Sequence, residues 1–309
     1  MPQPSYIRLF REGLLRERAD AARKLMDDCR VCPRNCQVDR NAGEKGVCHT
    51  GARAVVASYS AHFGEEEPLV GRYGSGTIFF AYCNLNCIFC QNYDISHLGE
   101  GREVGPETLA ALMLDLARVG CHNINLVTPT HVLGPILEAL LLAVDAGLDI
   151  PLVYNSGGYD SVEALRLLEG IVDIYMPDFK FWDNETARRF CGVPDYRDRA
   201  CEAVREMHRQ VGDLVLDNDG TAVRGLLVRH LVMPEGLAGT DKVAGFLADL
   251  SSETYLNVMG QYRPCGRAGE LPELSRPVSA MELELAKNAA RRAGLSRLDE
   301  RRGFLFRGL

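Results

Sequence analysis

Three cysteines lie close together in the first third of the chain, at Cys83, Cys87 and Cys90, with spacings of four and three residues. Thiolates at this spacing on one loop can bind three of the four irons of a cubane iron–sulfur cluster. The fourth iron then stays open to a second molecule, whereas a plain electron carrier has four cysteine ligands. The stretch therefore predicts a reactive [4Fe–4S] cluster. The alternative is a zinc site that borrows a fourth ligand such as His97.

An open iron of this kind can bind an amino group and a carboxylate together, and S-adenosylmethionine (SAM) offers both. Transfer of one electron into its sulfonium would break a carbon–sulfur bond and release a 5′-deoxyadenosyl radical, which abstracts hydrogen from a substrate. The cofactor supplies this chemistry, while the protein positions the reactants and excludes water. Phe89, next to the last cysteine, is expected to lie over a flat ligand such as adenine.

A second group of four cysteines precedes this loop, at Cys29, Cys32, Cys36 and Cys48. Four thiolates within twenty residues can close around one metal centre, which would be structural or electron-carrying. Zinc sites usually show two Cys-x-x-Cys pairs, and only the first pair here fits. The spacing therefore slightly favours a second iron–sulfur cluster over zinc, and four unligated thiols are the least favoured alternative.

The composition restricts the possible environments and partners. The 309 residues carry a net charge of −7, which argues against general binding to nucleic acid or docking to an anionic membrane. No apolar run resembles a signal peptide or a membrane span, so we expect a cytoplasmic protein. In that compartment, eleven cysteines indicate metal ligands more than disulfides. The four cysteines outside both groups are expected to be small buried apolar residues, namely Cys121, Cys191, Cys201 and Cys265.

Strand-like and helix-like segments alternate along most of the chain. The expected strands cover residues 77–81, 123–127, 152–154, 172–176, 225–232 and 254–259. The expected helices cover residues 106–119, 134–146, 161–169, 184–191, 198–211, 240–250 and 279–293. Such alternation is typical of a parallel sheet with its functional loops at the carboxyl ends of the strands. The three-cysteine loop follows the first of these strands.

The fold class predicted from this order is α/β, as a partial (β/α)6 TIM-type barrel with an N-terminal cysteine-rich metal-binding segment. Residues 1–76 would hold a helix over 1–28, the cysteine-rich segment and a lead-in strand. Residues 77–262 would form the barrel, and residues 263–309 a C-terminal helical extension.

The cysteine spacing, with an aromatic residue before the third cysteine, resembles the signature of the radical SAM superfamily. Within that superfamily, the runs Gly74–Phe80 and Gln91–Ser96 are similar to the pyruvate formate-lyase activating enzyme-like group. The resemblance covers residues 77 to about 262. It implies a [4Fe–4S] cluster on the three cysteines, SAM as the second cofactor, and a SAM site at the mouth of the barrel.

Two strand ends offer SAM contacts by this resemblance. Activating enzymes carry Gly-Gly-Glu, which helps to hold the methionine end of SAM, where this chain has Thr128-Pro129-Thr130-His131. Thr130 or His131 is expected to substitute, although His131 also fits an ordinary residue at the start of a helix. Asn155 and Ser156, before two glycines, match a polar pair that contacts ribose or carboxylate; the alternative is a simple turn.

Two further strand ends complete the expected SAM site. Asp178 and Lys180 resemble the Asp-x-Lys of the activating enzymes, and side chains two apart on a strand point the same way. A surface ion pair is the alternative. Arg229 or His230 is expected to bind the SAM carboxylate, although a buried histidine commonly only satisfies its hydrogen bonds. The run Glu65-Glu66-Glu67 more often marks a solvated face than a border of the barrel mouth.

The sequence therefore predicts a radical SAM oxidoreductase, served by an electron donor such as flavodoxin or ferredoxin. By resemblance its substrate would be a glycyl-radical enzyme. One alternative is radical modification of another protein, a peptide or a small metabolite. Another, from a different class, is a non-catalytic iron–sulfur electron carrier or redox sensor.

Overall fold

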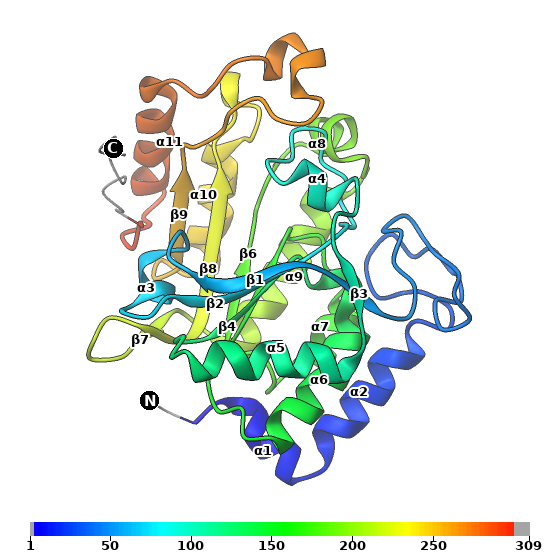
Figure 1. The fold of residues 1–309 in the computed structure, drawn as a ribbon. Helices are drawn as coiled ribbons and strands as arrows, with labels where there is room; N and C mark the ends of the chain where they lie inside the picture. Colours follow the sequence, from blue (N-terminus) through cyan, green and yellow to red (C-terminus); the bar gives the residue numbers. More distant parts are fainter. Residues whose placement is uncertain (1–2, 300–309) are drawn as a thin grey trace, which may run out of the picture.

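The computed structural model describes residues 3–299, and its centre is a curved sheet of six parallel strands (Figure 1). These strands are β2 (Ser75–Phe80), β4 (Ile124–Val127), β5 (Leu152–Ser156), β6 (Ile174–Pro177), β8 (Ala222–Leu231) and β9 (Tyr255–Met259). Each one pairs in parallel with the next in this order. All six lie where the sequence predicts them, which confirms the partial (β/α)6 barrel.

Helices cover the outer face of the barrel, as expected for β–α units. The long ones are α5 (Pro106–Arg118), α6 (Leu133–Asp145), α7 (Val162–Leu167), α8 (Asn184–Cys191), α9 (Tyr196–Val211), α10 (Thr240–Leu250) and α11 (Ala280–Arg292). Short 3-10 turns are η1 (Thr130–Val132), η2 (Pro234–Gly236), η3 (Ala268–Glu270) and η4 (Pro272–Leu274). Within residues 3–299, no helix is both long enough and apolar enough to cross a bilayer.

The N-terminal helix expected over residues 1–28 is instead two helices, α1 (Ser5–Arg11) and α2 (Leu14–Lys24). The break falls at Gly13, whose φ of +77° is a left-handed conformation that glycine adopts without a steric penalty. The turn lets α1 return to the barrel, where the Tyr6 hydroxyl donates to the carbonyl oxygen of Ile150 at 2.8 Å. The cysteine-rich segment follows α2 and lies at the outer edge of the molecule (Figure 1).

Antiparallel strands extend the sheet beyond the barrel. β1 (Ala54–His62) pairs with β2 on one side and with the short β3 (Arg102–Val104) on the other. β7 (Val215–Leu216) pairs antiparallel with β8. The short helices α3 (Glu67–Val70) and α4 (Tyr93–Ser96) flank β2, and α4 directly follows the three-cysteine loop. The expected C-terminal extension contains η3, η4 and α11, and its residues 300–309 lie outside the described part of the chain.

Part of the lower interior of the barrel is apolar. Alternate residues of the strands point inward, and a separate buried cluster contains Val153, Ile174, Met176 and Leu227 together with Leu69 of α3. The strand residues between them, such as Tyr154, point outward and belong to the larger core under the helices. A buried polar residue lies beside this cluster, because Asn125 of β4 pairs with Val153 of β5 and is fully buried.

Candidate active site

A cavity of about 720 Å³, including its open mouth, lies at the carboxyl ends of the barrel strands. The ends of β2, β4, β5 and β8 and the loops after β2, β4, β5 and β6 contribute its walls. The lining residues that the sequence singled out are Cys83, Cys87, Cys90, Asn155, Ser156, Asp178, Lys180 and Arg229. The tertiary structure thus brings all three loop cysteines and five of the seven other expected site residues into one cavity.

The three-cysteine loop is held by its own backbone and by neighbouring hydroxyl groups. Cys83 Sγ accepts a hydrogen bond from the Leu85 N–H at 3.4 Å, and Cys90 Sγ accepts one from the Ser96 hydroxyl at 3.2 Å. Burial raises the pKa of the Cys83 thiol to about 12, so deprotonation there must be coupled to metal binding. Three soft sulfur donors on one cavity wall fit a cluster held by three thiolates.

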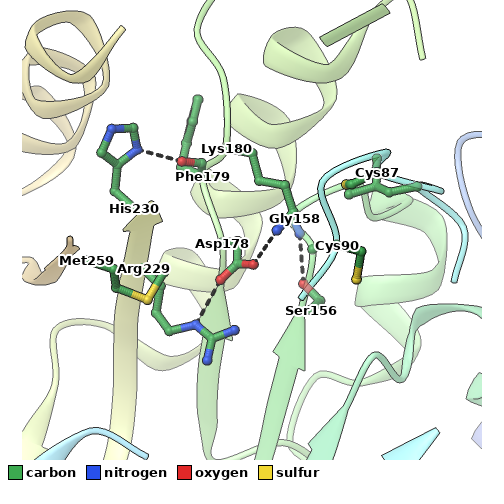
Figure 2. Close-up of polar contacts among 12 residues, drawn as sticks. Cys87, Cys90, Ser156, Gly158, Asp178, Phe179, Lys180, Arg229, His230 and Met259 are labelled. Carbon is green, nitrogen blue, oxygen red and sulfur yellow. Dashed lines mark hydrogen bonds and ion pairs between the residues drawn. The ribbon is translucent and has the colours of Figure 1, made fainter. Parts of the chain in front are cut away.

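Asp178 is the centre of a buried ion network on the opposite wall (Figure 2). Its Oδ2 lies 2.5 Å from Lys180 Nζ, and its Oδ1 accepts a hydrogen bond from Arg229 Nε at 2.8 Å. Arg229 Nη2 also donates to Asn155 Oδ1 at 2.9 Å. The alternative of a surface ion pair is therefore excluded, because these groups line the cavity.

Burial and charge act in opposite directions on this network. Burial alone would raise the pKa of Asp178, but the charges of Arg229 and Lys180 lower it below its ordinary value. Burial would lower the pKa of Lys180, yet the Asp178 carboxylate raises it. All three groups are therefore charged at neutral pH, and the network presents fixed cations beside the carboxylate of Asp178.

Ser156 is oriented by a buried carboxylate that the sequence did not single out. Asp160 accepts hydrogen bonds from Ser156 at 2.6 Å, from Thr130 at 2.7 Å and from the Tyr154 hydroxyl at 3.0 Å. The Gly158 N–H donates to Ser156 Oγ at 3.2 Å (Figure 2). A Cβ at Gly158 would lie 2.1 Å from the Asp178 carbonyl oxygen, so only glycine fits this close approach.

Two expected cofactor contacts are placed elsewhere. Thr130 is 2% exposed, and its hydroxyl faces Asp160 instead of the cavity, whereas Thr128 lines the cavity wall. Phe89 is 4% exposed and packs edge-on against Phe181, with ring centroids 5.7 Å apart. A ring buried in the core in this way is not available to stack on adenine, so we leave Phe89 and Thr130 out of the site.

Both histidines considered for the SAM site are core residues. His131 Nε2 lies 3.0 Å from the Ala81 carbonyl oxygen, and burial lowers the pKa of its imidazole to about 3. His230 contacts the Phe179 carbonyl oxygen at 2.6 Å and the Thr240 hydroxyl at 2.8 Å. The structure therefore places Arg229, and not its neighbour His230, on the cavity wall.

Glu65 and Glu66 of the acidic run are buried where a solvated face was favoured, so that prediction is wrong for these two residues, whereas Glu67 at the start of α3 is exposed. Glu65 lies 3.8 Å from Arg229 and is 8% exposed at its side chain. Burial would raise the pKa of Glu65, but the hydrogen bond with His62 and the charge of Arg229 lower it. Glu66 accepts a hydrogen bond from Asn257 of β9 at 2.8 Å, which links this segment to the last barrel strand.

The four N-terminal cysteines lie near one another. Burial raises the pKa of the Cys32 thiol to about 12, and the nearby thiols of Cys48, Cys29 and Cys36 add to this effect. Among residues 3–299, no three His, Cys, Asp or Glu side chains converge on a point that could hold a single metal ion. His97, the alternative zinc ligand for the second loop, stacks on Tyr93 with ring centroids 4.2 Å apart.

Arg34, from the cysteine-rich segment, reaches the three-cysteine loop. Its guanidinium donates to the carbonyl oxygens of Asn84 at 2.7 Å and Leu85 at 3.2 Å. It also donates to the carbonyl oxygens of Cys191 at 3.2 Å and Gly192 at 2.7 Å. No sequence pattern pointed to this residue, because its partners are backbone atoms from two distant segments.

Replacing Arg34 with glutamine is expected to loosen the three-cysteine loop, since glutamine cannot span four carbonyl groups. We expect the iron bound by the loop and the rate of SAM cleavage to fall about 10- to 100-fold, the range usual for residues that orient metal ligands. Iron analysis and 5′-deoxyadenosine measurement test this. Arg30→Gln, an exposed neighbour, is the matched control. Equal iron and equal rates in the two variants would contradict the role assigned to Arg34.

Comparison with known proteins agrees with the cavity chemistry. The family model described as the Radical SAM superfamily matches residues 77–218. Residues 77–218 therefore form a radical SAM domain. The uncharacterized protein MJ0674 of Methanocaldococcus jannaschii is 32% identical to this radical SAM protein over 292 residues, which are 92% of this chain and 80% of that protein.

Two other similar proteins were found. The uncharacterized protein MJ0808 of the same organism is 25% identical over 293 residues, covering 86% of this chain and 78% of that protein. Among solved structures, methylornithine synthase (PylB) is similar to this radical SAM protein. The alignment covers 93% of this chain and 77% of the PylB chain. The TM-score is 0.46 and the sequence identity is 16%.

Membership of this superfamily implies a [4Fe–4S] cluster, SAM and catalysis by SAM-derived radical chemistry. The cavity of this radical SAM protein fits that pair of cofactors, because three thiols form one wall and buried charged and polar groups form the other. The activating enzyme-like subgroup stays a prediction.

Proposed function

We propose that this protein cleaves SAM reductively and uses the resulting radical to take a hydrogen atom from its substrate. Cys83, Cys87 and Cys90 would hold the [4Fe–4S] cluster. Asn155, Ser156, Asp178, Lys180 and Arg229 would position SAM. The observation that carries the proposal is the shared cavity, in which the cysteines face the Asp178 network across one enclosed space.

Cys83, Cys87 and Cys90 would hold the cluster, which when bound and reduced would supply the one electron that reductive cleavage of SAM requires. The protein's own groups orient the reactants. Lys180 and Arg229 provide buried cations that suit a carboxylate, and charge-assisted hydrogen bonds of this kind are strong. Ser156 lines the cavity, and its hydroxyl is held by Asp160 and by the Gly158 N–H.

Formation of 5′-deoxyadenosine tests this proposal. The protein is reconstituted with iron and sulfide without oxygen, reduced with dithionite and mixed with SAM. We expect 5′-deoxyadenosine and methionine in equal amounts. An intact cluster that yields no 5′-deoxyadenosine would favour the alternative function of an electron carrier or redox sensor.

For the substrate, we propose a glycyl-radical enzyme, whose glycine Cα–H would be the hydrogen source. The support is the resemblance of residues 74–80 and 91–96 to the activating enzyme-like group. The test is a glycine-centred radical signal in a candidate partner, measured by electron paramagnetic resonance after incubation with the reduced protein and SAM. Turnover with a different protein, peptide or metabolite, and no such signal, would favour the alternative substrate classes.

We further propose that flavodoxin or ferredoxin delivers the electron in the cell. The chemistry needs a one-electron donor of low potential, and both protein classes provide one. Replacement of dithionite by reduced flavodoxin or ferredoxin should sustain 5′-deoxyadenosine formation.

For the cysteine-rich segment, we propose a second metal centre, either an iron–sulfur cluster or zinc, held by Cys29, Cys32, Cys36 and Cys48. The buried Arg40 supports it. Arg40 is 1% exposed, donates to the Gly51 carbonyl oxygen and lies 4.0 Å from Cys29 Sγ, with no carboxylate partner among residues 3–299. A buried cation needs a compensating negative charge, and a metal centre with four thiolates provides it.

The double variant Cys29→Ser/Cys32→Ser separates the two metal sites. If the segment holds a [4Fe–4S] cluster, iron per chain should fall from about eight to about four. If it holds zinc, the variant should lose zinc and keep its iron. The matched control is Cys121→Ser/Cys201→Ser, which removes two cysteines outside both groups. Unchanged iron and zinc in the first variant would contradict the second metal centre.

A further inference from the structure

The sequence predicts that Cys191 is a small buried apolar residue. In the structure it lies against Cys87, a ligand of the proposed cluster. Its Sγ is 3.2 Å from Cys87 Sγ. Cys191 is the last residue of α8 and is fully buried, whereas Cys87 lines the active-site cavity. The two sulfurs need to approach by only about 1.2 Å to reach the ~2.05 Å length of a disulfide bond.

Backbone contacts hold the two thiols together. The Ile88 N–H, next to Cys87, donates to the Phe190 carbonyl oxygen at 2.9 Å. Arg34 donates hydrogen bonds to the carbonyl oxygens of Cys191 and Gly192 at the end of α8. It also donates to carbonyl oxygens of the three-cysteine loop. The end of α8 is therefore fastened to the loop on both sides of the sulfur contact, and the pairing does not depend on a bound metal.

We propose that Cys87 and Cys191 form a reversible disulfide when the cluster is absent. The oxidant would be a low-molecular-mass disulfide such as glutathione disulfide. Cys87, which faces the cavity, attacks one of its sulfurs, forming a mixed disulfide and releasing one thiol. Cys191 then attacks the Cys87 sulfur, forming the internal disulfide and releasing the second thiol. Two protein thiols lose two electrons and two protons, and the oxidant gains both as two thiols.

This disulfide would control cluster assembly. With Cys87 bonded to Cys191, only Cys83 and Cys90 remain as ligands, and two thiolates cannot hold three corners of a cubane. The disulfide would also protect Cys87 from irreversible oxidation to sulfinic acid, because a disulfide is restored by simple thiols. The inference rests on the proposed function only in taking Cys87 as a cluster ligand.

Peptide mapping tests the disulfide directly. Cluster-free protein is treated with glutathione disulfide, its remaining thiols are alkylated, and trypsin is added. Trypsin releases Tyr73–Arg102, with the three loop cysteines, and Phe190–Arg197, with Cys191 as its single cysteine. We expect these two peptides to be joined, and to separate on reduction. Chymotrypsin cleaves after Phe89 and so separates Cys87 from Cys90. Fragmentation of the joined product then distinguishes Cys87 from Cys83 and assigns the bond to Cys87.

Variants and iron uptake complete the test. Cys191→Ser should abolish the joined peptides, and the control Cys201→Ser should retain them. In the Cys29→Ser/Cys32→Ser background, oxidation should lower iron uptake by the loop about tenfold or more, and dithiothreitol should restore it. Folded protein that gives no joined peptides, or joins Phe190–Arg197 through another cysteine, would overturn the inference. Failure to form 5′-deoxyadenosine would overturn the proposed function and leave the peptide result standing.

Discussion

Replacement of Cys90 by serine is expected to lower 5′-deoxyadenosine formation roughly a hundredfold or more, because loss of a metal ligand exceeds the 10- to 100-fold effect of the groups that merely orient ligands. A serine hydroxyl is a hard donor that keeps its proton at neutral pH, whereas iron–sulfur clusters require soft thiolates. Cys90 also accepts the hydrogen bond from Ser96, so the variant loses a fixed ligand position. Chromatographic measurement of 5′-deoxyadenosine, with iron and sulfide per chain, gives the result.

Cys201→Ser is the control, because Cys201 lies on α9 and belongs to neither cysteine group. It should keep the iron content and the rate of the wild type. A Cys90→Ser variant that retains a full cluster and cleaves SAM at the normal rate would show that the loop does not use its three cysteines as proposed.

Replacement of Asp178 by asparagine is expected to destabilise the fold by about 3–5 kcal/mol, the usual cost of removing one partner from a buried ion pair. Asparagine keeps the shape of the side chain but leaves Lys180 without its carboxylate and Arg229 with the more distant Glu65 and Glu66. The free energy of unfolding, from urea denaturation, measures the loss. Asp198→Asn, an exposed residue that pairs with Arg197 on the surface, should change the stability far less.

The Asp178→Asn variant is also expected to change how the free energy of unfolding depends on pH in the acid range. The folded protein holds the pKa of Asp178 below its unfolded value, so this carboxylate stabilises the fold at neutral pH. That stabilisation disappears as the pH falls from about 4, the unfolded pKa of aspartate, through the lower folded value. Asp178→Asn should therefore flatten the dependence of unfolding free energy on pH in the acid range. An unaltered pH dependence would mean that the network does not ionise as described.

The local patterns of the sequence were enough to predict the barrel. Six apolar strand segments alternate with helical ones, and each lies in the structure where its periodicity placed it. Polar residues at the ends of three of those strands, such as Asn155, Asp178 and Arg229, gather in one cavity because parallel strands share one carboxyl edge. The three-cysteine spacing needed no tertiary information, since all three ligands lie on one loop.

The direction of individual side chains was not available from such patterns. Thr130 turns toward Asp160 and Phe89 into the core, because each depends on a partner from a distant segment. Glu65 looks like part of a solvated run in the sequence, but Arg229 draws it into the barrel.

The fold class, the three-cysteine loop and eight residues of the cavity wall were predictable from the sequence, because periodicity and ligand spacing are properties of short segments. Only the tertiary structure decided that Arg34 would fasten the loop and that Cys191 would lie 3.2 Å from Cys87. Those contacts join residues about 50 and 100 positions apart, and only the packing of α8 and the cysteine-rich segment against the barrel brings them together.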